Sequence, residues 1–134
     1  MNLAIAPSTE TYTTLHMTAK ENPHIGEIIK LGYKTLQITG VYYSENYKYA
    51  DISVYEAWGK PGSHAPMTTC GHNMLLRKRE GGKWYFSGDE YLNDCIDGES
   101  AELLDGIVGD GALVVRDSMS ARWVPSPRRL ARKA

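Results

Sequence analysis

Two alternating stretches in the middle of the chain predict a β-hairpin. Residues 35–43 and residues 51–58 both place apolar side chains at every second position. This period of two is typical of a strand with one buried face. The polar connection at residues 44–48 joins the two strands. The residues expected on the buried faces are Leu36, Ile38 and Tyr42 in the first strand, and Ile52, Val54 and Trp58 in the second.

The pattern after this hairpin predicts a second hairpin, two short helices and a last pair of strands. The turn sequence Glu80-Gly81-Gly82 separates the two strands of the second hairpin. Ser87 and Glu90 have the spacing of a capping box and predict the start of a helix. The expected elements are strands at residues 73–79 and 83–86, helices at 89–96 and 100–105, and strands at 112–116 and 121–124.

The N-terminal part of the chain predicts a strand at residues 2–6 and then a helix. Asn22 can accept a hydrogen bond from a free helix amide, and Pro23 suits the first helical position. Gly32 would end the helix. The apolar stripe of this helix would consist of Ile25, Ile28 and Ile29.

This order of elements predicts an α+β fold. We expect a mostly antiparallel β-sheet built from hairpins, with two or three short helices on one face. A length of 134 residues suits one domain, and nine Tyr and three Trp supply core volume. We expect residues 1–124 to form a single compact α+β domain and residues 125–134 a basic C-terminal tail.

The sequence favours a cytoplasmic protein. Residues 1–7 lack the basic and apolar regions of a signal peptide, and no apolar run is long enough to span a membrane. Cys70 and Cys95 are too few for a disulfide framework, so both are expected to be reduced thiols. A single disulfide between them is the alternative.

Charge is segregated along the chain although the net charge is only −1. Residues 85–115 hold eight acidic residues and no basic one, whereas residues 116–134 carry a net charge of +5. A basic segment of this kind suits an anionic partner. Nucleic acid is the weaker candidate, because a protein with a pI near 6.4 lacks an overall basic field.

The predicted binding residues lie in the basic segment and in the tyrosine-rich hairpin. Five tyrosines between residues 42 and 55 exceed what one core face can accommodate, so some should form a recognition surface. The residues are Arg116, Arg122, Trp123, Arg128 and Arg129, with Tyr42, Tyr43 and Tyr47. Two other interpretations stay open: the acidic segment of the same or another copy neutralises the basic one, or the terminus is merely solvated.

The segment around Arg116 resembles part of a known family. The sequences Trp84-Tyr85-Phe86 and Glu99-Ser100-Ala101-Glu102-Leu103-Leu104, followed by the strand 111–118, resemble the opening half of an SH2 domain. This resemblance covers about 35 residues and implies that Arg116 binds a phosphate group. The chain departs from the family in the long gap between Phe86 and Glu99 and in the short sequence after Ser118.

A second segment resembles small phage enzymes that cleave S-adenosylmethionine. It consists of Leu31-Gly32-Tyr33, Ile38-Thr39-Gly40-Val41-Tyr42 and Ser53-Val54. The resemblance implies that Tyr42 and Glu45 would line the methionine end of that ligand. Any unit of a helix, a strand and a hairpin would show the same pattern.

Metal binding and catalysis have weaker support in the sequence. Zinc accepts His and Cys, but the spacing of His64, Cys70, His72 and Cys95 matches no compact zinc site. We therefore expect no metal and no cofactor. Glu56, with Tyr55 and His72, would form an acid–base pair only if the fold brought them together.

These observations favour a small non-catalytic binding or inhibitor module that recognises a phosphate-bearing or acidic partner. Its size and lack of a complete enzyme motif suggest an accessory protein of a phage or mobile element. The alternative is a small enzyme acting on a nucleotide-like metabolite such as S-adenosylmethionine. A third interpretation is a structural subunit of a larger assembly, and we expect a homo-oligomer.

Overall fold

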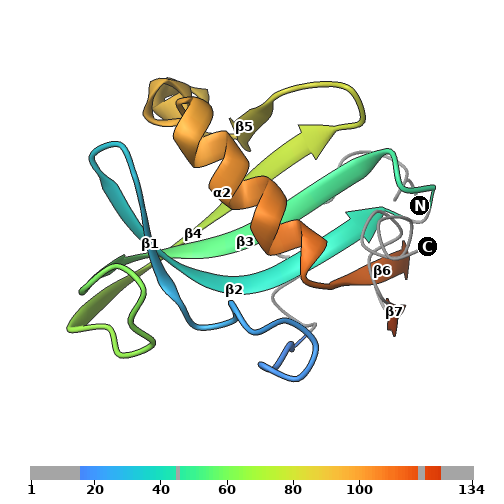
Figure 1. Ribbon diagram of the computed structural model, residues 1–134, viewed down its shortest axis with the longest axis horizontal. Helices are drawn as coiled ribbons and strands as arrows, with labels where there is room; N and C mark the ends of the chain where they lie inside the picture. Colours follow the sequence, from blue (N-terminus) through green and yellow to red (C-terminus); the bar gives the residue numbers. More distant parts are fainter. Residues whose placement is uncertain (1–15, 45, 118–119, 125–134) are drawn as a thin grey trace.

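Seven strands form one curled β-sheet in the computed structural model, which describes residues 16–44, 46–117 and 120–124 (Figure 1). Six strands follow the order β5-β4-β3-β2-β6-β7, and β1 pairs with the first half of β2. Every pairing is antiparallel except that of β2 with β6. The strands are β1 (Ile28–Leu31), β2 (Lys34–Ser44), β3 (Tyr49–Trp58), β4 (Thr68–Arg79), β5 (Trp84–Ser87), β6 (Ala112–Asp117) and β7 (Ser120–Val124).

The prediction of a mostly antiparallel sheet built from hairpins is confirmed. The hairpins β2–β3 and β4–β5 and the final strands lie where the alternating pattern places them. Two helices are described: the 3₁₀-helix η1 (Glu90–Cys95) and the α-helix α2 (Gly98–Gly109). Asp97 caps α2, because its Oδ1 accepts a hydrogen bond from the Ser100 amide at 2.7 Å. The described residues include no helix with the length and apolar character needed to cross a membrane.

The predicted helix from Asn22 to Gly32 is wrong, because its second half is strand β1. Ile28 and Ile29 are both buried, and adjacent buried β-branched residues suit a strand that is covered on both faces. Gly32, with a φ of 58°, opens a two-residue turn into β2. A Cβ atom there would lie only 3.0 Å from the Cα of Cys95. The short run of isoleucines therefore fits the period of a helix and that of a strand, and pairing with β2 decides for the strand.

The capping box predicted for η1 is also wrong. Ser87 belongs to β5, and Asp89 is the N-cap residue without a side-chain capping bond. The Glu90 carboxylate instead accepts a hydrogen bond from the Gly88 amide at 2.8 Å. The strand predicted at residues 2–6 and the tail at residues 125–134 lie outside the described residues.

The main core lies where α2 crosses the sheet (Figure 1). Leu104, Ile107 and Val108 of α2 belong to the same buried cluster as Ile52 and Leu76 of the sheet. Trp58 was expected in this core, but its side chain is 57% exposed. It is the last residue of β3, beyond the part of the strand that the core covers.

The pairing of β2 with β3 contains a bulge beside a glycine. Ile38 pairs with Val54 and Gly40 with Ser53, so Thr39 is the extra residue. The hydroxyl group of Thr39 donates to the Ser53 carbonyl oxygen at 3.0 Å. The Tyr42 ring lies over Gly40, and any Cβ atom at residue 40 would overlap it. Glycine at this position therefore makes room for the ring.

We predict that Gly40→Ala lowers the free energy of unfolding by about 1–3 kcal/mol, as overpacked cores do. Chemical denaturation would measure the change. Gly106→Ala is the matched control, because residue 106 has open space on α2, and we expect it to stabilise the helix by about 0.5–1 kcal/mol. If Gly40→Ala lowers the free energy of unfolding as much in the Tyr42→Ala protein as in the original protein, the ring is not the cause.

An ion pair is buried between β3 and β4. Arg77 and Asp51 are direct cross-strand partners, with side chains 1% and 0% exposed. The Arg77 Nε and Nη2 atoms donate to the two carboxylate oxygens at 2.7 and 2.8 Å. The guanidinium group also lies 4.6 Å from the centre of the Tyr49 ring. This geometry satisfies both charges away from water.

We predict that Asp51→Ala costs about 3–5 kcal/mol of stability, because it leaves the Arg77 charge buried without its carboxylate. Replacing both residues in Asp51→Leu/Arg77→Met should cost less than the single change. Lys78→Ala, which breaks the more exposed pair with Asp105, should cost about 1 kcal/mol or less. Chemical denaturation of the original protein and the three variants measures these losses. A larger loss in the double variant than in Asp51→Ala would contradict the prediction.

Candidate functional site

Three pairs of strand ends meet at one end of the sheet, which we call the turn end. It comprises the end of β2 and start of β3, the end of β4 and start of β5, and the end of β6 and start of β7. The antiparallel hairpins alternate in direction and β6 runs parallel to β2, so these ends lie side by side (Figure 1). With neighbouring strands about 4.8 Å apart, β4 and β6 are separated by about 14 Å. Residues far apart in the sequence therefore share this end.

The parallel pairing of β2 with β6 brings the two predicted groups of binding residues together. Tyr43 pairs with Val114 and Ser44 with Val115. The turn after Ser44, which contains Tyr47, therefore lies beside Arg116, the residue after Val115. The sequence placed these groups about 70 residues apart and gave no sign that they meet.

The final hairpin places the other predicted residues by register. Arg122 pairs with Val114, and Trp123 pairs with Leu113. Arg116 lies in the irregular step between Val115 and Asp117. Strand β7 forms one edge of the sheet. Arg128 and Arg129 lie outside the described residues.

The three predicted tyrosines have different surroundings. Tyr42 and Tyr43 are buried in the core, so neither presents an open aromatic face. Tyr47 is 39% exposed, has a positive φ of 60° in the turn, and makes an edge-to-face contact with Tyr43 at 5.5 Å. Of the three tyrosines, Tyr47 is the one whose ring reaches solvent at the turn end.

Basic residues that the sequence analysis missed also lie at the turn end. Lys48, Arg79 and Lys83 are exposed residues of the two turns next to β3 and β4. The Lys48 carbonyl oxygen accepts a hydrogen bond from the Glu80 amide at 2.7 Å, which ties these two turns together. Glu80 and Asp117 are acidic residues at the same end. Arg79 ends the basic run Arg77-Lys78-Arg79, and only the strand register brings it and Lys83 to the same end of the sheet as Lys48.

The second hypothesis from the sequence depended on Tyr42 and Glu45. The Tyr42 side chain is 1% exposed, and burial together with the nearby Glu21 raises its pKa above the ordinary value for tyrosine. Glu45 lies outside the described residues. A ring packed over Gly40 in the core offers no surface to a metabolite.

A polar cluster lies toward the other end of the sheet, where β4 bulges against β3. Tyr55 pairs with Asn73 and Ala57 with Thr69, so residues 70–72 lie opposite Glu56 alone. The carboxylate of Glu56 forms an ion pair with Lys34 and accepts a weak hydrogen bond from the Cys70 thiol at 3.5 Å.

The fold brings His72 near Glu56, as the acid–base hypothesis required. The hydrogen bond from Lys34, opposed by partial burial, lowers the pKa of Glu56, and the Cys70 thiol and the nearby His72 add to this effect. A carboxylate that stays ionised in an ion pair is a poor proton donor. The arrangement therefore resembles a structural ion pair more than a catalytic one.

The four possible zinc ligands make separate contacts. Cys70 contacts Glu56, Cys95 is buried beneath the Gly32 turn, and His64 contacts the Pro23 carbonyl oxygen at 3.3 Å. Within the described part of the chain, no three His, Cys, Asp or Glu residues are arranged to hold a metal ion.

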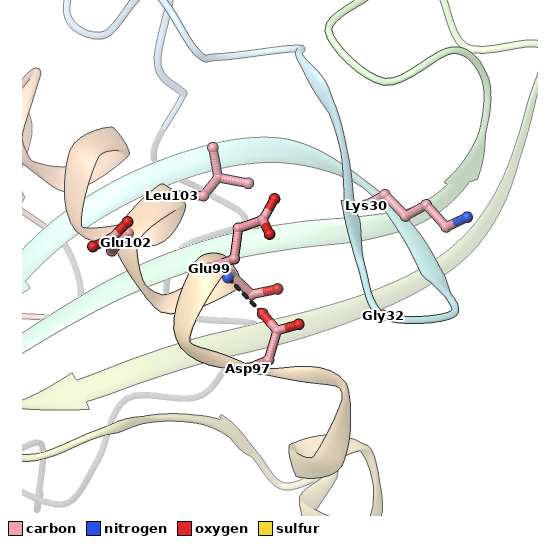
Figure 2. A pocket seen from close by; sticks show the side chains of 7 residues that line it. Lys30, Gly32, Asp97, Glu99, Glu102 and Leu103 are labelled. Atoms are coloured by element: carbon pink, nitrogen blue, oxygen red, sulfur yellow. Dashed lines mark hydrogen bonds between the residues drawn. The ribbon is translucent and has the colours of Figure 1, made fainter.

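A cleft of about 600 Å³ lies between the β1–β2 turn and the start of α2 (Figure 2). Its charged lining is acidic apart from Lys30, with Asp97, Glu99 and Glu102 along the first turns of α2. Hydrogen bonds from Ser100 lower the pKa of Asp97. Three of the eight acidic residues of residues 85–115 thus line this cleft, whereas Asp105 pairs with Lys78 of β4.

Comparisons with known proteins give no relative from which a function could be transferred. No protein-family model matches the chain, and no curated protein or solved structure is significantly similar to it.

We predict that one thiol reacts rapidly with a thiol reagent such as Ellman's reagent in the native protein and two react after denaturation. Cys70 is exposed, whereas Cys95 is 3% exposed and both are free thiols. Cys70→Ser should remove the rapid phase, and Cys95→Ser should leave it unchanged. Two rapid native thiols would contradict the burial of Cys95.

Proposed function

We propose that this protein is a small binding module without catalytic chemistry of its own, and that the turn end recognises a phosphate-bearing or acidic partner. The observation that carries the proposal is the parallel pairing of β2 with β6. It joins the exposed Tyr47 to the strand that carries Arg116, two features that the sequence alone could not connect.

The chemistry of the turn end suits an anionic group. Arg116 and Arg122 stand on one hairpin, and an arginine can bind a phosphate or carboxylate through two parallel hydrogen bonds. Exposed Lys48, Arg79 and Lys83 add positive charge along the neighbouring turns. Tyr47 can contribute aromatic contact area beside these charges.

The enzyme alternative has less support from the geometry. Tyr42, which it required in a pocket, is buried over Gly40. Glu56, the other carboxylate considered, is in an ion pair with Lys34. We therefore prefer binding to catalysis for this fold.

A homo-oligomer remains part of the proposal. The acidic cleft lies at the start of α2, and the basic residues lie at the turn end, so two copies can meet through surfaces of opposite charge. The biological role that we propose is that of a cytoplasmic accessory or inhibitor protein of a phage or mobile element. We also propose that the short helices lie on one face of the sheet.

A titration of the isotopically labelled full chain with inorganic pyrophosphate tests the anion site by NMR. We expect amide shifts at residues 46–49 and 112–124, with an affinity that falls as salt is added. Arg116→Ala and Lys48→Ala should each weaken binding about tenfold, because each removes one charged hydrogen bond worth about 1.5 kcal/mol.

Lys60→Ala is the matched control for Lys48→Ala, since Lys60 is an exposed loop lysine away from the turn end. It should leave the affinity unchanged. Shifts centred on the acidic cleft, or equal losses in Lys48→Ala and Lys60→Ala, would contradict the proposed site.

A further inference from the structure

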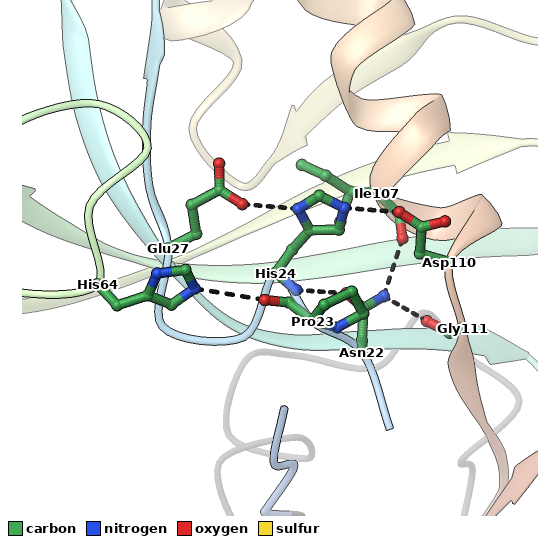
Figure 3. A network of polar contacts seen from close by, with 8 residues as sticks. All are labelled: Asn22, Pro23, His24, Glu27, His64, Ile107, Asp110 and Gly111. Carbon is green, nitrogen blue, oxygen red and sulfur yellow. Dashed lines mark hydrogen bonds and ion pairs between the residues drawn. The ribbon is translucent and has the colours of Figure 1, made fainter. Parts of the chain in front are cut away.

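A histidine bridges two carboxylates where the segment before β1 meets the end of α2 (Figure 3). His24 Nδ1 lies 2.6 Å from Glu27 Oε1, and its Nε2 lies 2.7 Å from Asp110 Oδ2. Glu27 directly precedes β1, whereas Asp110 is the C-cap residue of α2. Both ring nitrogens are therefore engaged, and the imidazole joins two segments that are 86 residues apart.

The residues around this bridge hold the same two segments together. Asn22 is fully buried, and its side-chain amide donates to the carbonyl oxygens of Ile107 and Gly111 at 2.8 and 2.6 Å. Its side-chain oxygen accepts a hydrogen bond from the His24 amide at 2.9 Å. These bonds fix the histidine backbone beside the helix end whatever the charge of its ring.

Among the described residues, three charged or titratable side chains make contacts at or next to His24. Glu27 comes from its own segment and Asp110 from the end of α2. His64, from the loop between β3 and β4, contacts the Pro23 carbonyl oxygen next to His24 at 3.3 Å. Two carboxylates thus contact the ring itself, while the second histidine contacts the carbonyl oxygen of the preceding residue, Pro23.

The number of ring protons decides how many of these contacts can form. A protonated imidazole has two N–H donors and can serve both carboxylates, whereas a neutral one has a single donor. On loss of the proton, one carboxylate must therefore give up its hydrogen bond. The Asp110 side chain is 47% exposed and that of Glu27 is 20% exposed, so water can replace the contact of Asp110 more easily.

We propose that Glu27, His24 and Asp110 form a pH-sensitive clamp that holds the end of α2 to the segment before β1 while His24 is protonated. Loss of the proton releases Asp110, and Asn22 keeps the two segments adjacent. Asp110 and Gly111 lead directly into β6, so the bond that changes with pH adjoins the start of the strand that carries Arg116. This is a regulatory device in addition to the proposed binding function and does not depend on it.

The electrostatics of the ring favour its protonated form. Burial favours the neutral form of His24, but the hydrogen bonds and charges of Glu27 and Asp110 outweigh it and raise the pKa above the ordinary value of 6.5. A raised folded-state pKa stabilises the fold fully below the unfolded value. This contribution is lost as the pH rises from about 6.5 through the folded-state pKa.

An NMR titration of the histidine ring signals of the full chain tests the clamp. We expect a midpoint for His24 above 6.5, and we expect the amide signals of Gly111 and Ala112 to shift with the same midpoint. Asp110→Asn should lower the His24 midpoint, whereas Asp94→Asn, at an exposed aspartate of η1, should leave it unchanged.

His24→Gln supplies the second readout. This variant should lose the pH-dependent shifts of Gly111 and Ala112, and its thermal stability should no longer fall across the interval in which His24 titrates. A His24 midpoint at or below 6.5, an unchanged midpoint in Asp110→Asn, or Gly111 shifts that persist in His24→Gln would overturn the clamp.

Discussion

The buried ion pair between Asp51 and Arg77 constrains the sheet on which everything else depends. Both charges are satisfied only when these two residues are direct cross-strand partners. A slip of β4 by one residue would turn Arg77 away from Asp51, toward the face whose side chains pack under α2. Such a pair contributes more to the choice of register than to net stability. The register of β3 against β4 then determines which turns and which charges meet at the turn end.

Strand β2 extends this constraint to the rest of the molecule, because it pairs with β1, β3 and β6. The bulge at Thr39, next to Gly40, shifts its register against β3 by one residue. Its parallel pairing with β6 carries the last hairpin to the same end as the Tyr47 turn. The result is a molecule with basic turns at one end of the sheet and an acidic cleft beside the start of α2. Basic residues from the turns before β3 and after β4 and acidic residues from the start of α2 thus lie on different parts of the surface.

The two proposals place regulation and recognition at opposite ends of β6. The clamp around His24 adjoins the first residue of this strand, and the proposed anion site includes Arg116 near its end. Strand β6 is therefore the element that the two proposals share.

The sequence by itself determined the hairpins from β2 to β5, the helical segment and the final strand pair, because the period of two and the turn residues are local signals. It failed at residues 22–32, where a short run of isoleucines fits a helix and a strand equally well and only pairing with β2 distinguishes them. It also led us to propose Arg116 and Tyr47 as binding residues without showing that they are neighbours. Only the tertiary structure brought Lys48, Arg79 and Lys83 to the same end of the sheet and joined His24 to Asp110. These contacts link residues distant in the chain, and no local pattern of side chains encodes them.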